Sequence, residues 1–255
     1  MKACGDSPPL VLLHGWGMHA GVWSGVIDRL DWAGEVICPQ WPGHGGNVQQ
    51  AGAAEPAMWL SCARPEIPQG AVWVGWSLGG LLAFSDAAYA YEPLGILAVA
   101  STPRFRRAPD WPHGMTAEGL DDFKGRLARH PGQLLRRFRS LLVLGEEDAR
   151  RAQCAERLEA LARPVDPVAL AQGLGLLDGF DACETLGRAP CPVRFLLGVN
   201  DPLVPVSLSD WLQARGWGCQ CVEAGHLLPL CEPDRVAGEI RRFAQALQGV
   251  TGENK

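Results

Sequence analysis

The stretch VWVGWSLGG, residues 72–80, decides the fold of this 255-residue chain. It joins a run with strand character to the pattern Gly-x-Ser-x-Gly, and the small-residue run LLAFSDAAYAY follows at once. The pattern predicts a strand over 71–76, a sharp turn at the serine and a helix over 78–91. Such a turn projects the serine hydroxyl from the carboxyl edge of a sheet. Gly75 and Gly79 fit the turn because side chains there would collide with the neighbouring strand and helix.

Strand and helix signals alternate along the rest of the chain. Further candidate strands lie at 10–13, 35–38, 95–100, 193–199 and 219–223. The first, LVLL, shows no alternation of polar and apolar residues, which is typical of a strand buried on both faces. Between most of these runs, apolar residues recur at helical spacing, which predicts helices. The order predicts an α/β fold, a mostly parallel sheet flanked by helices.

The segment from 104 to 187 contains helical runs and no convincing strand. We therefore expect residues 1–103 and 188–255 to form an α/β core, and 104–187 to form a helical cap above the carboxyl edge, where sites of open sheets form. Residues 104–163 hold 13 of the 23 Lys and Arg against nine Asp and Glu, a balance of about +4 in a chain of net charge −5. A basic surface favours an acidic partner, although ordinary charge scatter on solvated helices remains an alternative.

Composition limits the class of protein. Hydrophobic residues make up 47% and charged residues 20% of the chain, as in soluble globular proteins. No apolar run reaches the roughly 18 residues of a membrane span, and the N-terminus is a poor signal peptide. Nine scattered cysteines without C-x-x-C spacing indicate reduced thiols rather than disulfides or a zinc site. We expect a cytoplasmic monomer with no metal, no membrane contact and no nucleic-acid partner.

A serine nucleophile needs a base and a carboxylate that orients the base. In this fold the chain order is serine, acid, histidine, so the acid and the base follow Ser77. His226, in Glu-Ala-Gly-His, lies beyond the last predicted strand and is the candidate base, although a plain surface histidine is the alternative. Asp201 follows the strand 193–199 directly and is the candidate acid, with a turn or a helix N-cap as its alternative role. Asp210 and Glu223 are poorer choices for the acid.

Acyl transfer also needs donors for the oxyanion of the tetrahedral intermediate. We assign one to the backbone N–H of Leu78, directly after the serine, and one to the N–H of Trp16, in the loop after the first strand. The Trp16 side chain is also a candidate wall of the acyl pocket. His14 is better explained as a structural loop residue than as a second base, and His44 as a loop filler.

The motifs HGWG, WPGHG, GWSLGG, GVNDPLVP and AGH together resemble the α/β-hydrolase superfamily over nearly the whole chain. The stretches HGWGMHAGVW, VASTPRF and RRFRSLLVLGEEDARR resemble, within it, the family of pimeloyl-[acyl-carrier protein] methyl ester esterases of biotin synthesis. This resemblance implies a Ser-Asp-His triad at the three residues assigned above and substrate contacts at Trp16, Leu78 and Phe138. It also implies that Arg137 and Arg150 hold the carrier protein, and that no cofactor is needed.

Two departures from the family concern the basic residues of the cap. Gln133 and Cys154 stand where the family has arginines, while Arg136, Arg139 and Arg151 lie near enough to substitute. The carrier-protein contact is therefore expected to be shifted. The sequence predicts a serine carboxylesterase acting on the pimeloyl methyl ester carried by acyl-carrier protein, or on small-molecule esters. A general short-chain carboxylesterase or C–C bond hydrolase is the first alternative, and a non-catalytic ligand sensor is the second.

Overall fold

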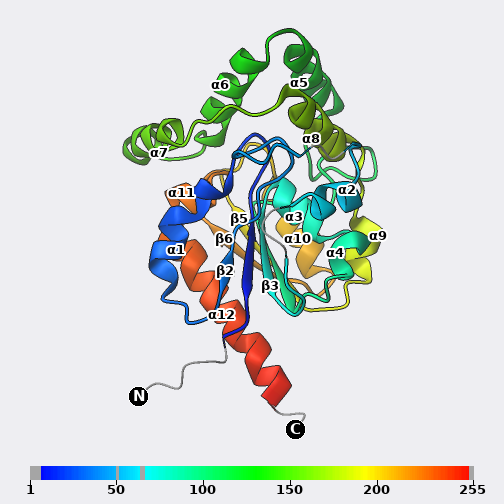
Figure 1. The fold of residues 1–255 in the computed structure, drawn as a ribbon, viewed down its shortest axis with the longest axis vertical. Helices are drawn as coiled ribbons and strands as arrows, with labels where there is room; N and C mark the ends of the chain where they lie inside the picture. Colours follow the sequence, from blue (N-terminus) through cyan, green and yellow to red (C-terminus); the bar gives the residue numbers. More distant parts are fainter. Residues whose placement is uncertain (1–6, 50–51, 64–66, 253–255) are drawn as a thin grey trace.

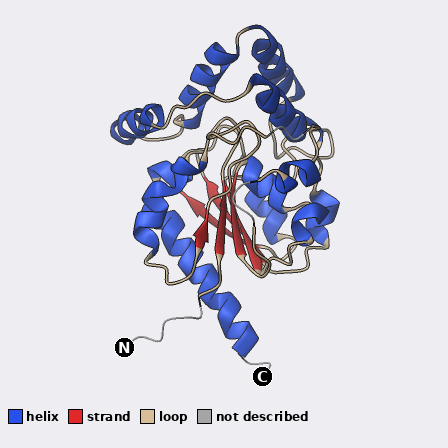
Figure 2. Cartoon of the chain, in the orientation of Figure 1, coloured by secondary structure: helices blue, strands red, loops and turns tan. Residues whose placement is uncertain are grey.

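The computed structural model of the chain describes residues 7–49, 52–63 and 67–252. Six strands form one sheet in the order β2-β1-β3-β4-β5-β6, and every neighbouring pair is parallel (Figure 2). The strands are β1 (Leu10–Leu13), β2 (Val36–Ile37), β3 (Val72–Trp76), β4 (Gly95–Val99), β5 (Val193–Gly198) and β6 (Gly218–Val222). The predicted parallel sheet is confirmed, with each strand close to its expected range.

The centre of the sheet is buried on both faces. Every residue of β1, β3 and β4 is buried, which explains why these strands read as continuous apolar runs rather than alternating ones. β3 lies between β1 and β4, with Val72 paired to Leu10 on one side and to Gly95 on the other. The strand that leads to Ser77 is thus fixed by hydrogen bonds on both edges.

Helices cover both faces of the sheet (Figure 1). One layer contains α1 (Ser24–Leu30), preceded by a 3-10 turn at Ala20–Trp23, with α11 (Leu228–Cys231) and α12 (Pro233–Gly252). The other contains α2 (Pro56–Ser61), α3 (Leu78–Ala83), α4 (Asp86–Tyr89), α9 (Cys183–Gly187) and α10 (Leu208–Gln213). Nowhere in these described ranges is there a helix both long and apolar enough to cross a membrane.

The single helix predicted over 78–91 is wrong, because the structure divides it into α3 and α4. The division falls at Phe84 and Ser85. The Ser85 hydroxyl accepts a hydrogen bond from the N–H of Ala88 at 3.1 Å and donates one to the carbonyl of Leu82 at 2.7 Å. Serine hydroxyls favour helix starts for this reason, and here the second helix begins at the serine cap.

Four helices lie above the carboxyl ends of the strands, at the top of Figure 1. They are α5 (Ala117–Arg129), α6 (Pro131–Leu142), α7 (Asp148–Ala160) and α8 (Pro167–Gly179), all within the predicted cap. The chain leaves and rejoins the core at adjacent points, where the N–H of Ala182 donates to the carbonyl of Pro103 at 2.8 Å and Arg104 forms a salt bridge with Asp181.

The last part of the predicted cap range packs on the core. α9 lies beside α4 in Figure 1, and the Tyr89 hydroxyl donates to the carbonyl of Thr185 at 3.3 Å. The division into residues 1–103 with 188–255 and a cap at 104–187 remains a prediction about domains. The position of the four cap helices is what matters for the site, because they cover the edge at which Ser77 emerges.

Candidate active site

Ser77 occupies the sharp turn between β3 and α3. Its backbone angles are φ 55° and ψ −120°, a region that non-glycine residues rarely occupy. The N–H of Ser77 donates to the carbonyl of Val99 at 3.0 Å, and the Ser101 hydroxyl donates to the carbonyl of Ser77 at 2.7 Å. β4 and the loop after it therefore hold the strained turn that directs the side chain away from the sheet.

The two glycines that flank the serine have no space for a side chain. A Cβ atom on Gly75 would lie 2.5 Å from the N and Cα atoms of Gly80, in α3. A Cβ atom on Gly79 would lie 2.3 Å from the carbonyl oxygen of Leu13, in β1. The predicted reason for both glycines is confirmed, since close contact with a helix and a strand excludes any larger residue.

His226 joins the serine to a carboxylate. Its Nε2 lies 3.0 Å from Ser77 Oγ, and its Nδ1 lies 2.7 Å from Asp201 Oδ2. The imidazole and the carboxylate are fully buried, and the serine is 5% exposed. In this arrangement the hydroxyl donates to Nε2 while Nδ1–H donates to the carboxylate, the geometry with which a histidine removes the proton of a serine.

The carboxylate is held by the backbone that follows it. Asp201 Oδ1 accepts hydrogen bonds from the N–H groups of Leu203 at 2.7 Å and Val204 at 3.0 Å. The other oxygen is left to face the histidine. Asp201 therefore also forms a turn, which was its alternative role. The turn fixes the carboxylate in place. On the other side of the ring, the Trp76 indole donates to the carbonyl of His226 at 2.9 Å.

The two candidate oxyanion donors belong to segments next to the serine, the start of α3 and the loop after β1. Leu78 is the first residue of α3, so its N–H has no partner within that helix. The loop that carries Trp16 packs on the nucleophile, since a Cβ atom on Gly15 would lie 3.2 Å from the Cβ of Ser77. The oxyanion role of these two N–H groups remains a prediction.

Aromatic side chains of the cap pack on Trp16, in the loop next to the serine. The Trp16 ring meets Phe138 of α6 edge-on, with centroids 4.8 Å apart, and Phe123 of α5 at 6.3 Å. The Trp16 indole N–H donates to the carbonyl of Leu170, in α8, at 2.9 Å. Three cap helices thus contact this one ring. The structure brings Phe138 to Trp16, and their role in lining an acyl pocket remains a prediction.

The two loop histidines that we assigned structural roles lie side by side and do not contact Ser77. His14 Nε2 accepts the N–H of Trp41 at 3.2 Å, and His44 Nδ1 donates to the carbonyl of Pro42 at 2.7 Å. Their ring centroids are 5.6 Å apart. Burial lowers the pKa of His44 to about 4 and that of His14 well below its usual value. Both imidazoles are therefore neutral parts of the loop packing.

The two arginines expected to hold a carrier protein lie at different places in the cap. Arg137 lines a pocket of about 400 Å³ between the ends of α5 and α6, together with Arg126 and Arg129. Arg150, near the start of α7, forms an ion pair with Glu232 of the core. Among the residues that the structure describes, no group of His, Cys, Asp and Glu side chains is suited to hold a metal ion.

Sequence reasoning missed three contributions from the cap. Phe123 and Leu170 contact Trp16, and the carboxylate of Glu146 accepts the N–H of Gly225, the residue before His226, at 2.7 Å. Phe123 and Leu170 each lie in a run whose apolar residues have helical spacing. That spacing does not show which face of the helix meets the site. Glu146 stands in an acidic run, GEED, and its contact depends on how the cap folds back on the core.

The chain belongs to the alpha/beta hydrolase family, whose model matches residues 10–239. Among curated proteins, it is 36% identical over 219 residues to a pimeloyl-[acyl-carrier protein] methyl ester esterase of Aromatoleum aromaticum, covering 82% of this chain and 86% of the relative. A protein of the same name from Xanthomonas campestris pv. campestris is 35% identical, with 95% of this chain and 97% of the relative covered.

Solved structures match the fold. An esterase from Exiguobacterium antarcticum superimposes with a TM-score of 0.81 at 18% identity, covering 94% of this chain and 93% of that chain. A thermophilic esterase from Thermogutta terrifontis gives a TM-score of 0.75 at 22% identity, covering 95% and 91%. At these identities the likeness concerns the fold alone.

Proposed function

We propose that the chain is a serine carboxylesterase that hydrolyses the methyl ester of pimeloyl-acyl-carrier protein, releasing methanol, in biotin synthesis. The observation that carries the proposal is the buried His226 that bridges Ser77 and Asp201. The curated relatives, which match nearly the whole chain, supply the substrate. The aromatic cluster of Trp16, Phe123 and Phe138 suits an acyl chain, and no step of the reaction needs a cofactor.

The reaction follows from the contacts. Ser77 Oγ attacks the ester carbonyl while His226 Nε2 takes the hydroxyl proton, and Asp201 stabilises the imidazolium. The N–H groups of Trp16 and Leu78 bind the oxyanion. The imidazolium then gives its proton to the departing methoxide, and methanol leaves. His226 next takes a proton from water, and the resulting hydroxide attacks the acyl-enzyme carbonyl. The bond to Ser77 Oγ then breaks, the imidazolium returns its proton to that oxygen, and the pimeloyl carboxylate leaves.

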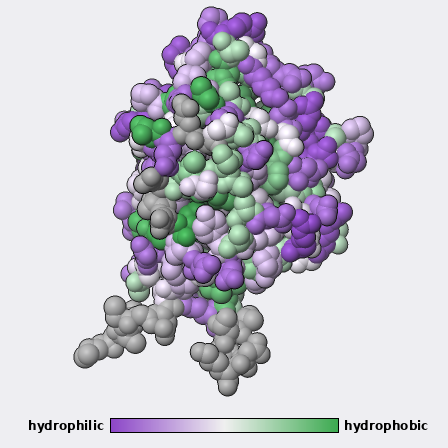
Figure 3. Space-filling view, turned by 45° about the vertical axis from the view of Figure 1, so that its right-hand side comes forward, coloured by the Kyte–Doolittle hydropathy of each residue, from purple (hydrophilic) through white to green (hydrophobic). Residues whose placement is uncertain are grey.

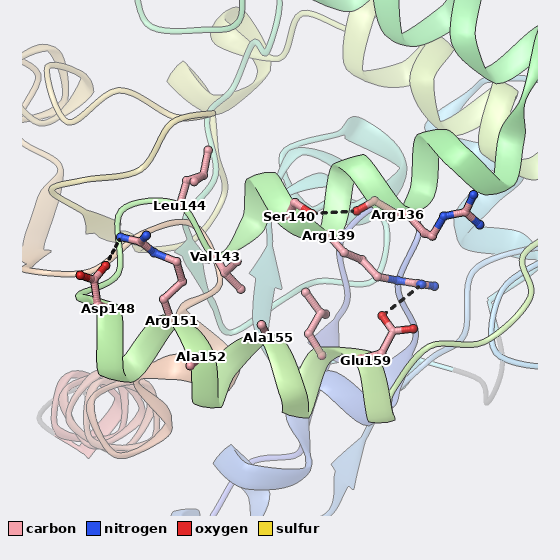
Figure 4. Close-up of a pocket in the computed structure, with 11 residues that line it drawn as sticks. Arg136, Arg139, Ser140, Val143, Leu144, Asp148, Arg151, Ala152, Ala155 and Glu159 are labelled. Atoms are coloured by element: carbon pink, nitrogen blue, oxygen red, sulfur yellow. Dashed lines mark hydrogen bonds and ion pairs between the residues drawn. The ribbon is translucent and has the colours of Figure 1, made fainter.

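The carrier protein would dock on the basic surface of the cap, with Arg137 at the ends of α5 and α6 and Arg150 near the start of α7 as its two contact points. Between α6 and α7 there is a groove of about 660 Å³ with an apolar floor that includes Val143 and Ala155 (Figure 4). Arg136, Arg139 and Arg151 line it, and the last two face Glu159 and Asp148. Hydrophilic side chains are abundant at this end of the molecule (Figure 3). Such a surface suits the acidic helices of a carrier protein. We also propose that the enzyme is cytoplasmic and acts as a monomer.

Turnover of the carrier-bound ester tests the proposal. We expect the wild-type protein to release methanol from methyl pimeloyl-carrier protein, and Ser77→Ala to lose this activity by about 10³-fold or more. Turnover that survives the substitution would contradict the mechanism. Cleavage of nitrophenyl esters without cleavage of the carrier-bound ester would instead identify a general short-chain esterase. No hydrolysis of any ester, and no labelling of Ser77 by a fluorophosphonate, would favour a ligand sensor.

A further inference from the structure

The link between α6 and α7 touches both loops that carry the acid and the base. Gly145 has φ +91°, and a Cβ atom there would lie 2.1 Å from the carbonyl oxygen of Asn200, the residue before Asp201. A Cβ atom on Gly225 would lie 2.4 Å from the carbonyl oxygen of Leu144. The link 144–146 therefore packs its backbone directly on the backbone of the two loops.

Glu146 adds a directed contact to this packing. The residue is 3% exposed, and its Oε1 accepts the N–H of Gly225 at 2.7 Å. Its Oε2 is buried without a hydrogen-bond partner in the described part of the chain, and burial raises the pKa of the carboxyl group. Burial of a carboxylate costs free energy unless the group is hydrogen-bonded or paired, and here the N–H of Gly225 provides a hydrogen bond.

The contact completes the set of bonds around His226. From the core, the Trp76 indole holds the carbonyl of His226, and the N–H of Asn200 donates to the carbonyl of Ala224 at 3.0 Å. From the cap, Glu146 holds the N–H of Gly225. Gly225 has no side chain with which to anchor itself. The bond to Glu146 and the close backbone contact with Leu144 link it to the cap.

One cation compensates the charge of the carboxylate. Arg150 Nη1 lies 3.7 Å from Glu146 Oε2 and forms a closer ion pair with Glu232, one residue beyond α11. The guanidinium is partly exposed while Glu146 is enclosed. The carboxylate thus faces the N–H of Gly225 in the histidine loop, the Cys231 thiol of α11 and one positive charge from α7.

We propose that Glu146 is a positioning residue for His226, acting from the cap through the N–H of Gly225. The proposal rests on the proposed function, since it assumes that His226 is the base of an ester hydrolase. A hydrogen bond at this point fixes the loop that carries the imidazole, and small displacements of a base from its nucleophile lower the rate strongly. The closed cap would thereby be part of the active arrangement, beyond its role as a cover for the acyl chain.

Hydrolysis of p-nitrophenyl butyrate by purified variants tests this, because a small ester does not depend on carrier docking. Glu146→Leu removes the acceptor at similar volume, and we expect kcat to fall about tenfold with KM nearly unchanged. Glu146→Gln keeps an acceptor oxygen and should restore kcat to within about threefold of wild type. Glu147→Ala, at the exposed neighbouring acid, is the matched control and should leave both constants unchanged.

Thermal melts of each variant show whether the protein is folded at the assay temperature, and kcat is taken only from folded samples. Wild-type kcat in Glu146→Leu would overturn the proposal. So would an equal loss in the Leu and Gln variants, or an effect confined to KM. A wild-type protein that cleaves no ester would instead refute the proposed function itself.

Discussion

The strain at Ser77 is compensated by its neighbours. A non-glycine residue at such backbone angles costs about 1–3 kcal/mol and persists only where the surroundings impose it. Here the N–H of Ser77 is bonded to Val99 and its carbonyl to Ser101. Both partners belong to β4 or the residues just after it. The direction of the nucleophile is therefore a property of the sheet, and it would persist in a variant that lacks the hydroxyl.

The buried histidines predict how stability depends on pH. In the unfolded chain a histidine takes up a proton near pH 6.5, whereas burial lowers the pKa of His44 to about 4 in the folded protein. Between these values the unfolded state binds more protons, so the free energy of unfolding falls as pH decreases. We expect His44 to account for about 3 kcal/mol of this loss, with His14 acting in the same direction. Urea unfolding between pH 7 and pH 4.5 measures the effect.

A pair of substitutions isolates the contribution of the buried ring. His44→Gln keeps a donor for the carbonyl of Pro42 but cannot titrate, so its stability should decline less steeply with acid. His130→Gln, at an exposed histidine, is the control and should follow the wild-type slope. An unchanged slope in His44→Gln would show that the acid sensitivity has another source.

At the scale of the element, α8 determines where Trp16 lies. A Cβ atom on Gly173 would lie 2.6 Å from Cδ1 of Trp16 and 3.1 Å from the ring of Trp59. We expect Gly173→Ala to lower the free energy of unfolding by about 1–3 kcal/mol, because overpacking displaces these rings. It should also lower kcat/KM for nitrophenyl esters, since Trp16 belongs to the loop that packs on Ser77. Guanidinium unfolding and steady-state kinetics measure the two effects.

The same helix offers a control. A Cβ atom on Gly179, the last residue of α8, would meet no heavy atom within 4 Å. Gly179→Ala is expected to leave the free energy of unfolding unchanged or to raise it by up to about 1 kcal/mol, because alanine has a higher helix propensity than glycine. Equal effects at the two positions would mean that contact with Trp16 does not limit residue 173.

The elements differ in how well the sequence predicts them. Strands β1, β3 and β4 are short apolar runs bounded by turn residues, and such runs have few other structures available in an α/β chain. The division between α3 and α4 was missed because Ser85 lies in a run that is otherwise helical, and a serine reads equally well as a helix residue or as a cap.

The site was predictable where it depends on chain order. Ser77, Asp201 and His226 each follow a strand, and the carboxyl ends of parallel strands meet at one edge. The contacts from the cap were not predictable in this way. Glu146 reaches Gly225, 79 positions away, only because the link between α6 and α7 folds down onto the core. No local pattern encodes that approach.

At the scale of the whole molecule, charge is divided between the two ends. The segment 104–163 is about +4, while the rest of the chain is about −9. An acidic carrier protein should therefore be attracted to the cap and repelled by the core. We expect Arg137→Glu to raise KM for the carrier-bound ester about tenfold and to leave nitrophenyl ester kinetics unchanged. Raising the salt concentration should weaken wild-type turnover of the carrier-bound ester in the same selective way.

Arg215→Glu, on the core between α10 and β6, reverses one charge outside the four cap helices as a control. It should leave KM for the carrier-bound ester unchanged. A similar rise in KM for both variants would indicate a long-range effect of net charge. No rise for either variant would show that Arg137 does not contribute to docking.

The adjacent exit and return points of the cap, joined by Pro103 and Ala182, have a consequence for evolution and engineering. An insertion whose two ends meet can be exchanged for another without reshaping the scaffold, so substrate range is free to diverge while the nucleophile is inherited. The contact of Glu146 with Gly225 limits that freedom. A transplanted cap would need to carry its own replacement for this contact, and lineages that exchanged caps should show paired changes in the link after α6 and the loop before the histidine.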